Sequence, residues 1–427
     1  MGSGSYEGRI SLSAPPQGRD PYKWVFARQS AGCGAQSWEN GGMSKLPDLD
    51  PASSAHSRLV ADHLAAQIRG AGGWLPFDRW MEQALYAPGL GYYAAGSAKL
   101  AEGGRHPSGD FVTAPELTPL FAQTLARQVA EVLEACGGIE VLEFGAGTGA
   151  LAAGMLAALD ELGVAARYRI VEVSADLRDR QRARLAAYGD RVAWLDVLPA
   201  AFTGCVVANE VLDAMPVRLF RWTEGGLAER GVALDENARF VWRDRAAPAD
   251  LAEAVSSRMP PLPGYVSEIN PRGEAFVRGM GAWLRAGAAL LIDYGFSRAE
   301  YYHPQRMEGT LMCHLRHVAH ADPLVAVGVQ DITAHVDFTA MAEAAAEGGL
   351  EVLGYASQAG FLMNAGLMEL LSRLDPADAA AYAQAVAPVQ KLLSPAEMGE
   401  LFKVLAVGRG LDRPLSGFGR GDRSHTL

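Results

Sequence analysis

The stretch from Ile139 to Gly149, IEVLEFGAGTG, constrains the fold of this chain more than any other part of the sequence. A short apolar run ends in an acidic residue and then breaks into glycines at Gly145, Gly147 and Gly149. Followed by helical spacing of apolar residues over 151–162, this pattern predicts a strand, a tight turn and a helix. Glycines let a ligand lie against the backbone, and a helix start offers unpaired N–H groups. The stretch therefore predicts a loop that binds a nucleotide-type cofactor.

The glycine loop alone does not identify the cofactor. Gly145, Gly147 and Ala150 also fit the G-x-G-x-x-G/A pattern of proteins that bind dinucleotides. At this point a nicotinamide cofactor remains an alternative, and so does a glycine turn that binds no ligand.

Composition excludes several classes of protein. With 427 residues, 49% of them hydrophobic and 20% charged, the chain belongs among soluble globular proteins of two or three domains, or of one domain with insertions. It lacks the run of about 18 apolar residues that a membrane span needs. The net charge of -11 argues against an extended electrostatic interface with nucleic acid and favours a protein or small-molecule substrate. Because the cysteines form no C-x-x-C pair, we expect neither a disulfide framework nor a thiolate metal site, and we expect a reducing compartment.

The order of patterns along the chain predicts an α/β protein with an insertion. Strand-like runs alternate with helical patterns after the glycine loop, which predicts right-handed crossovers and a mostly parallel sheet. Short β runs beyond Pro216 predict an antiparallel cap. We divide the chain into a disordered extension (1–50), a helical N-terminal region (51–135), a cofactor-binding core (136–215), an inserted cap subdomain (216–286), the rest of the sheet with a loop insertion (287–408) and a flexible tail (409–427).

Acidic residues stand where the predicted parallel strands end, and ligands bind at that edge of such sheets. Glu172 follows Gly149 by 23 residues, close to the spacing of a carboxylate that accepts hydrogen bonds from ribose hydroxyls. Asp196, at the next strand end, is placed to accept from an adenine amine. Together with Glu143, these carboxylates repel a pyrophosphate but suit the sulfonium and ammonium of S-adenosylmethionine. This charge argument favours methyl transfer over hydride transfer.

Seven motifs in this order resemble the MidA-like class I methyltransferases, a family that includes the mitochondrial arginine methyltransferase acting in the assembly of respiratory complex I. They are GYY (91–93), GDFVTAPE (109–116), LEFGAGTG (142–149), VEVS (171–174), ANEVLDAMP (208–216), DYG (293–295) and DITAHVDF (331–338). The resemblance implies a Rossmann-like sheet of seven strands, six parallel and one reversed, and a loop 109–116 beside the cofactor. Ala146 and Thr148 depart from the Pro and Arg of many members.

The expected S-adenosylmethionine site combines the glycine loop, the acidic strand ends and the family loop. Its residues are Glu143, Gly145, Ala146, Gly147, Gly149, Glu172, Val173, Asp196, Val197 and Asn209, with Thr113, Pro115 and Glu116.

We expect the acceptor site just past the fourth strand of the core. A guanidinium stays charged at every relevant pH, so carboxylates must hold it bidentately and draw its charge away from the attacking nitrogen. Glu210 and Asp213, with Asn209 beside them, are the expected catalytic residues. The alternative interpretation of the two carboxylates is an acidic cap on a helix N-terminus. Asp293 and Tyr294 are predicted to end the next strand, and we expect them to border the same pocket.

No metal site is expected. His314, His317 and His320 have the spacing i, i+3, i+6, but three ligands on one short helix do not converge, and no carboxylate or thiolate completes the set. His335 is expected to be a hydrogen-bonded histidine in a family loop.

Three classes of function follow from these observations. The first is a methyltransferase acting on an arginine of a protein such as a respiratory complex subunit. The second is an S-adenosylmethionine-binding assembly factor without catalysis, and the third, a nicotinamide oxidoreductase, is disfavoured by the acidic strand ends. We expect neither nucleic-acid binding nor membrane insertion. A homodimer remains an alternative to a monomer. The expected compartment is the bacterial cytoplasm, or the mitochondrial matrix in a eukaryote.

Overall fold

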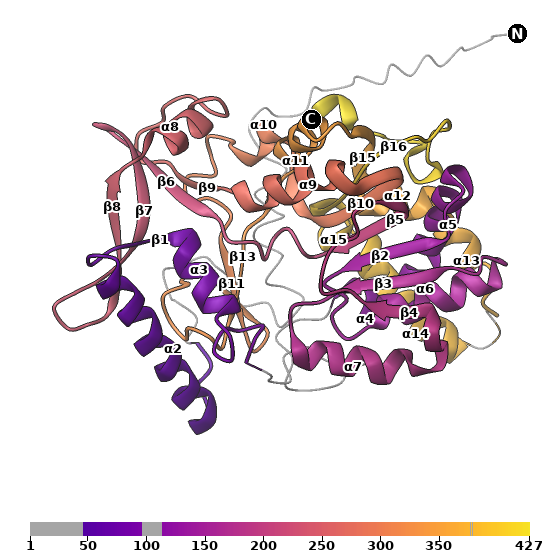
Figure 1. Ribbon diagram of the computed structural model, residues 1–427, viewed down its shortest axis with the longest axis horizontal. Coiled ribbons are helices and arrows are strands. Elements are labelled where there is room, and N and C mark those ends of the chain that lie inside the picture. The colour runs from indigo at the N-terminus through magenta and orange to yellow at the C-terminus, as the bar shows by residue number, and fades with distance from the viewer. Residues whose placement is uncertain (1–45, 96–112, 376, 378) are drawn as a thin grey trace, which may run out of the picture.

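The computed structural model describes residues 46–95, 113–375, 377 and 379–427, so most of the predicted extension 1–50 lies outside the described residues. The described chain forms two lobes (Figure 1). The larger lobe contains a mostly parallel sheet between layers of helices, and the smaller lobe contains antiparallel sheets and the first helices of the chain.

Within the described residues, the large sheet consists of seven main strands and a short addition. Its order is β15 (Glu351–Ser357), β16 (Phe402–Arg409), β10 (Leu284–Phe296), β5 (Phe202–Asn209), β2 (Glu140–Phe144), β3 (Arg167–Val171) and β4 (Val192–Trp194). All are parallel except β16, which runs antiparallel to both of its neighbours. The two-residue β14 (Val336–Asp337) extends the end of β10. The prediction of six parallel strands and one reversed strand is confirmed.

Helices cover both faces of this sheet, which explains why its central strands are almost wholly apolar. Alternate residues of β2 point to opposite faces: Val141 packs in a core with α5 (Pro119–Cys136) and α6 (Ala150–Glu161). Leu142 packs in a second core with α9 (Pro271–Trp283) and α11 (Phe338–Glu347).

Other helices of the large lobe are short or lie near its edges. They are α4 (Ala114–Leu117), α7 (Ala175–Leu185), α10 (Arg298–Tyr301), α12 (Gln358–Asn364), α13 (Leu367–Leu371), α14 (Ala379–Leu393), α15 (Met398–Leu401) and the 3-10 turns η3 (Ala186–Arg191), η4 (Ser416–Phe418) and η5 (Ser424–Thr426). Within the described part of the chain, no helix is long and apolar enough to span a membrane.

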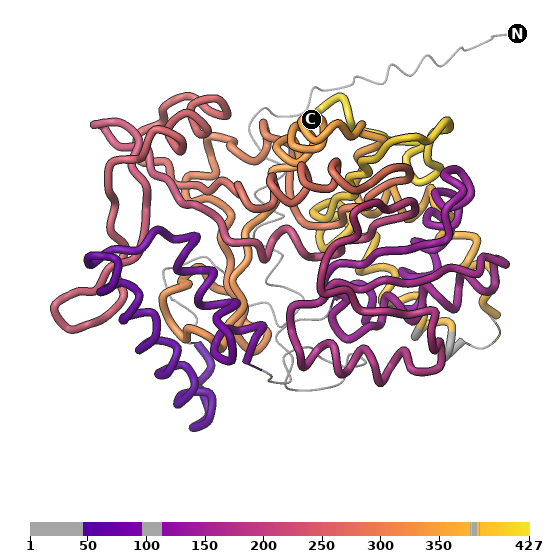
Figure 2. The backbone as a smooth tube through the Cα atoms, viewed as in Figure 1, coloured from indigo at the N-terminus to yellow at the C-terminus, as the bar shows by residue number. Residues whose placement is uncertain are grey.

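The smaller lobe is built around an antiparallel sheet. Its strands are β1 (Leu75–Pro76), β6 (Arg218–Thr223), β7 (Gly226–Leu234), β8 (Phe240–Ala246) and β9 (Val266–Ile269). Helices α2 (Pro51–Gly70) and α3 (Phe77–Tyr86) lie beside it, as the backbone trace shows (Figure 2). The strands β11 (Met312–Leu315), β12 (Val318–His320) and β13 (Asp331–Thr333) form another small sheet there, and α8 (Ala249–Ser256) packs over β6 and β9.

Two predicted domain boundaries need correction. The helical region 51–135 does not form one unit, because α2 and α3 pack on the antiparallel sheet whereas α5 packs on the large sheet. The cap 216–286 ends earlier than expected, because Val277, Met280 and Trp283 of α9 belong to the core of the large sheet.

The tail 409–427, expected to be flexible, instead packs against the large lobe. Leu415 and Phe418 are buried in the core beside α5 and α12. Asp422 accepts a hydrogen bond from the Tyr355 N–H at 2.9 Å, and the Arg423 N–H donates to the Tyr355 carbonyl at 2.6 Å. The tail thus forms hydrogen bonds with backbone groups of β15 at the edge of the sheet, which stabilises its docked position. The polar composition of the segment did not indicate these contacts.

Candidate functional site

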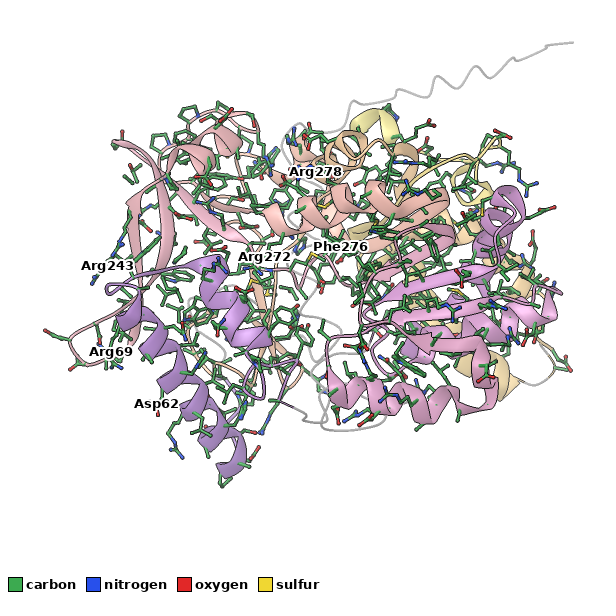
Figure 3. All side chains as sticks on the ribbon, in the orientation of Figure 1. Asp62, Arg69, Arg243, Arg272, Phe276 and Arg278 are labelled. Carbon is green, nitrogen blue, oxygen red and sulfur yellow. The ribbon has the colours of Figure 1, made fainter. Side chains whose placement is uncertain are left out.

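A cavity of about 690 Å³ lies where the carboxyl ends of β2, β3, β5 and β10 face the smaller lobe. This volume falls in the range of roughly 300–1,000 Å³ typical of small-molecule sites. Arg272 and Phe276 of α9 border the cavity, and Figure 3 shows them between the lobes, whereas Asp62, Arg69 and Arg243 lie away from it on the smaller lobe. The position agrees with the rule that parallel sheets bind ligands at their carboxyl edge.

The glycine loop forms the floor of one end of the cavity. Gly145, Gly147 and Gly149 have φ angles of 63°, 53° and 82°, in the left-handed region that side chains disfavour. A Cβ on Gly145 would also lie 3.1 Å from Cγ2 of Val211. Gly145, Ala146 and Gly147 line the cavity, whereas Gly149 lies behind it as the N-cap of α6. The sequence needs glycine here for the turn itself as well as for a ligand's close approach.

Glu172 presents a fixed carboxylate to this end of the cavity. It is 6% exposed, and its two oxygens accept hydrogen bonds from the Ser174 N–H and from Nε2 of Gln181, both at 2.9 Å. Gln181 also donates to the Gly147 carbonyl at 2.9 Å, which ties the carboxylate to the glycine loop. Burial raises the pKa of Glu172 above its ordinary value. Val173, next in sequence, is 79% exposed on the cavity rim.

Glu143 lines the cavity from a more deeply buried position. The Tyr168 hydroxyl donates to its carboxylate at 2.7 Å. Burial nevertheless raises the pKa of Glu143 to about 8, because the carboxylate loses its hydration and Glu172 adds a like charge.

The expected third acidic strand end does not join the cavity wall. The Asp196 side chain is 80% exposed and forms an ion pair with Arg178 at 2.7 Å, and Val197 is 81% exposed. Neither residue borders the cavity. A contact of Asp196 or Val197 with an adenine ring therefore stays a prediction.

The described part of the family loop, Thr113–Glu116, approaches the glycine loop. Thr113, Pro115 and Glu116 line the cavity. The Glu116 carboxylate accepts hydrogen bonds from the Thr148 hydroxyl and from Arg184 of α7, the latter at 3.1 Å. A guanidinium thus stands beside Thr148, although position 148 itself lacks the Arg of many family members. Residues 109–112 of the motif lie outside the described residues.

Asn209 and Glu210 stand at the end of β5, at the other end of the cavity. Nδ2 of Asn209 donates to Oε1 of Glu210 at 3.0 Å. Glu210 has a φ of 55°, which costs a residue other than glycine about 1–3 kcal/mol and is typical of functional positions. Burial, with repulsion from Asp213, raises the pKa of Glu210 to about 8.

Asp293 holds the turn that carries Asp213. Its Oδ2 accepts from the N–H groups of Val211, Leu212 and Asp213 at 3.2, 2.9 and 3.2 Å. No helix begins over 210–217 in the described chain, so the interpretation of these carboxylates as a helix cap is wrong.

Asp213 itself is 3% exposed and accepts a hydrogen bond from the Tyr294 hydroxyl. Burial raises the pKa of Asp213 to about 6. Its Oδ1 is buried and has no hydrogen-bond partner among the described residues. Asp213 and Tyr294 both line the cavity, so this oxygen belongs to a side chain at the cavity wall.

Sequence reasoning missed several cavity residues that come from the smaller lobe and α9. They are Glu82, Tyr86, Tyr93, Arg272, Phe276 and Asp331. Tyr93 and Asp331 belong to motifs quoted above, which was a usable signal, whereas the sequence around Arg272 offered none.

The three spaced histidines do not share a helix. His314 lies on β11, His320 on β12, and His317 in the turn between them with a φ of 66°. Among the described residues, no group of three or more potential ligands is placed to hold a metal. His335 is buried and its ring stacks on Phe296, with centroids 5.5 Å apart. The ring forms a hydrogen bond with the Thr310 backbone, as expected, whereas its Nε2 has no partner in the described chain.

Comparison with known proteins identifies the family. The model of a family of S-adenosyl-L-methionine-dependent methyltransferases matches residues 124–356, more than half of the chain. A Burkholderia thailandensis protein crystallised with S-adenosyl-homocysteine is 54% identical, with a TM-score of 0.86 over 90% of this chain and 100% of its own. The chain belongs to this family of S-adenosylmethionine-dependent methyltransferases.

More distant relatives of the methyltransferase carry a more specific name. The Rattus norvegicus mitochondrial protein arginine methyltransferase NDUFAF7 is 28% identical over 396 residues, which cover 84% of this chain and 86% of the relative. The Homo sapiens NDUFAF7 is 27% identical over 388 residues, covering 81% and 82%.

The cavity residues fit S-adenosylmethionine, the cofactor of this methyltransferase. Glu172 offers the type of carboxylate that binds ribose hydroxyls, and the glycine loop leaves the backbone open to the ligand. Oδ1 of Asn209 is buried without a partner among the described residues and can accept from an ammonium. The bound cofactor supplies an electrophilic methyl carbon, so the protein's task is to hold and align the acceptor.

Proposed function

We propose that this methyltransferase transfers a methyl group to an arginine guanidinium of a protein. The observation that carries the proposal is Oδ1 of the cavity-lining Asp213, a buried oxygen without a hydrogen-bond partner in the described chain. Such an atom costs about 1–3 kcal/mol unless a ligand donates to it. The name of the NDUFAF7 relatives agrees with this choice of acceptor.

Glu210 and Asp213 suit a guanidinium because it presents several N–H donors in one plane. Two carboxylates on one side hold the group and draw its positive charge toward them, which leaves the attacking nitrogen more electron-rich. That nitrogen bonds to the methyl carbon as the carbon–sulfur bond breaks, and the electron pair stays on sulfur. We assign the acceptance of the proton that the nitrogen releases to deprotonated Glu210, which accepts a hydrogen bond from Asn209.

The proposed partner is a folded or folding protein that exposes an arginine, for which a respiratory complex subunit is our candidate. We place the reaction in the mitochondrial matrix of a eukaryote or in the bacterial cytoplasm. The alternative, an assembly factor that binds the cofactor without catalysis, uses the same cofactor residues and differs at the acceptor end, where both carboxylates are present.

The test is incubation of the purified protein with methyl-labelled S-adenosylmethionine and a lysate of cells that lack it. Mass spectrometry of the labelled peptides then identifies the modified side chain. We expect methylarginine, and we expect much less of it with a Glu210→Gln variant. Label on another type of residue would contradict the choice of acceptor, and cofactor binding without any label would support the assembly factor.

A further inference from the structure

The acceptor end of the cavity is completed by residues of the smaller lobe. Tyr86 ends α3, Tyr93 follows it, and Asp331 begins β13; all three line the cavity. The rings of Tyr86 and Tyr93 are stacked, with centroids 5.4 Å apart and an angle of 22° between their planes. Figure 1 shows α3 and β13 on the side of the smaller lobe that faces the large sheet. Segments far apart in sequence therefore meet opposite Glu210 and Asp213.

Hydrogen bonds fix these side chains to one another and to the acceptor turn. The Tyr93 hydroxyl donates to Oδ1 of Asp331 at 2.8 Å. The Tyr86 hydroxyl donates to the Ala214 carbonyl at 2.9 Å, next to Asp213. Asp331 is 2% exposed as a residue, so the orientation of its carboxylate is set by the protein rather than by solvent.

Several carboxylates gather at this end of the cavity among the described residues. Asp213 and Asp331 both contribute to the raised pKa of Glu210, after the larger effect of burial. Arg272 also borders the cavity, but its guanidinium forms two hydrogen bonds with Glu82, at 2.6 and 2.8 Å. A cation that enters between Glu210, Asp213 and Asp331 would relieve their mutual repulsion.

We propose that Asp331, held by Tyr93, binds the cationic acceptor side chain together with Glu210 and Asp213, and selects a guanidinium over a neutral group of the same shape. This inference rests on the proposed arginine methylation and assigns to the smaller lobe a part in choosing the substrate. The stacked rings of Tyr86 and Tyr93 add an aromatic surface of the kind that attracts cations. A neutral urea of the same shape lacks the charge and presents a carbonyl oxygen in place of one N–H donor, and a site built to receive such donors discriminates strongly against an analogue that lacks one.

The experiment measures binding of two probes to the full chain saturated with S-adenosylhomocysteine. N-acetyl-arginine amide carries the guanidinium, and N-acetyl-citrulline amide carries a neutral urea of the same shape. Calorimetry should show the arginine probe binding to wild type at least about tenfold more tightly than the citrulline probe. Asp331→Asn should weaken the arginine probe at least about tenfold, remove most of this preference and leave the affinity for S-adenosylhomocysteine unchanged.

Matched variants separate recognition from stability. Tyr93→Phe removes the hydroxyl that holds Asp331, so it should weaken the arginine probe by a smaller factor, with a KM effect larger than its kcat effect. Asp322→Asn removes the same charge from an exposed position of the smaller lobe and should change neither probe. Melting temperatures show whether each variant is folded, and Tyr93→Phe carries the test if Asp331→Asn is not.

The outcomes distinguish this inference from the arginine proposal. Wild-type affinity for the arginine probe in a folded Asp331→Asn variant would overturn the role of Asp331 and leave arginine methylation standing. Binding of N-acetyl-lysine amide in place of the arginine probe, weakened by Asp331→Asn, would support Asp331 and contradict arginine as the acceptor. If neither cationic probe binds to wild type, the role of Asp331 is overturned.

Discussion

The Tyr168 hydroxyl donates a 2.7 Å hydrogen bond to the Glu143 carboxylate beneath the glycine loop. The bond stabilises the charged form, yet burial dominates and raises the pKa of Glu143 to about 8. The cofactor end of the cavity therefore contains a carboxyl group that keeps its proton near neutral pH in the ligand-free protein.

We expect the stability of the ligand-free protein to fall as the pH rises from about 5 to about 8. The unfolded chain releases the Glu143 proton near the ordinary value of about 4.5, whereas the folded protein keeps it until about pH 8. The folded state thus binds more protons in this window, and the free energy of unfolding decreases with pH. Urea unfolding of Glu143→Gln should show a flatter pH dependence. Glu161→Gln controls for net charge, and identical slopes in wild type and Glu143→Gln would refute the expectation.

Glu172→Ala should weaken S-adenosylhomocysteine by about 1–3 kcal/mol, because the ribose hydroxyls lose a charged acceptor. Calorimetry of the folded variant gives the affinity. Asp179→Ala removes an exposed carboxylate of α7 and should bind the ligand like wild type. Unchanged affinity of Glu172→Ala for S-adenosylhomocysteine, or tight binding of NAD by wild type, would show that the glycine-loop end of the cavity is wrongly assigned to S-adenosylmethionine.

Glu210→Gln and Asp213→Asn should each reduce methyl transfer by about tenfold to a hundredfold, because the amides keep the shape but lose the charge that holds the acceptor. Affinity for S-adenosylhomocysteine should barely change, since other residues bind it. Glu236→Gln, in the exposed turn between β7 and β8, controls for net charge. Normal turnover in both variants would eliminate the carboxylate clamp.

The acceptor carboxylates also predict a pH profile. Burial raises the pKa of Asp213 to about 6 and that of Glu210 to about 8, so both are charged only in alkaline solution. We expect kcat/KM of the free enzyme to rise between about pH 6 and pH 8. In Glu210→Gln the residual activity should lose the upper part of this rise. A profile that is flat over this range in wild type would contradict the prediction.

Asp293→Asn should destabilise the protein by about 2–4 kcal/mol, because the new amide nitrogen cannot accept from the backbone N–H groups that Oδ2 now satisfies. Methyl transfer should fall as well, since this turn places Asp213. Asp235→Asn offers a matched control: Asp235 also accepts from two backbone N–H groups, but in an exposed turn far from the cavity. It should cost less stability and leave transfer unchanged, and equal effects of the two substitutions would argue against a special role for Asp293.

The sequence by itself determined the features that depend on neighbours along the chain. The glycines at 145, 147 and 149, the apolar strands and the acidic strand ends follow from local backbone conformation and from burial on both faces of a parallel sheet. Most of the residues expected at the cofactor line the cavity, whereas Gly149, Asp196 and Val197 do not, and their contacts with the cofactor stay a prediction.

Only the tertiary structure decided how distant segments meet. Tyr86, Tyr93 and Asp331 reach the acceptor end because two lobes pack together, and no periodicity along the chain encodes that contact. The docking of Leu415 and Phe418 depends in the same way on a hydrophobic surface formed by remote helices. Local patterns specify strands, turns and helices, whereas the walls of a cavity between lobes depend on side chains that become neighbours only when the chain has folded.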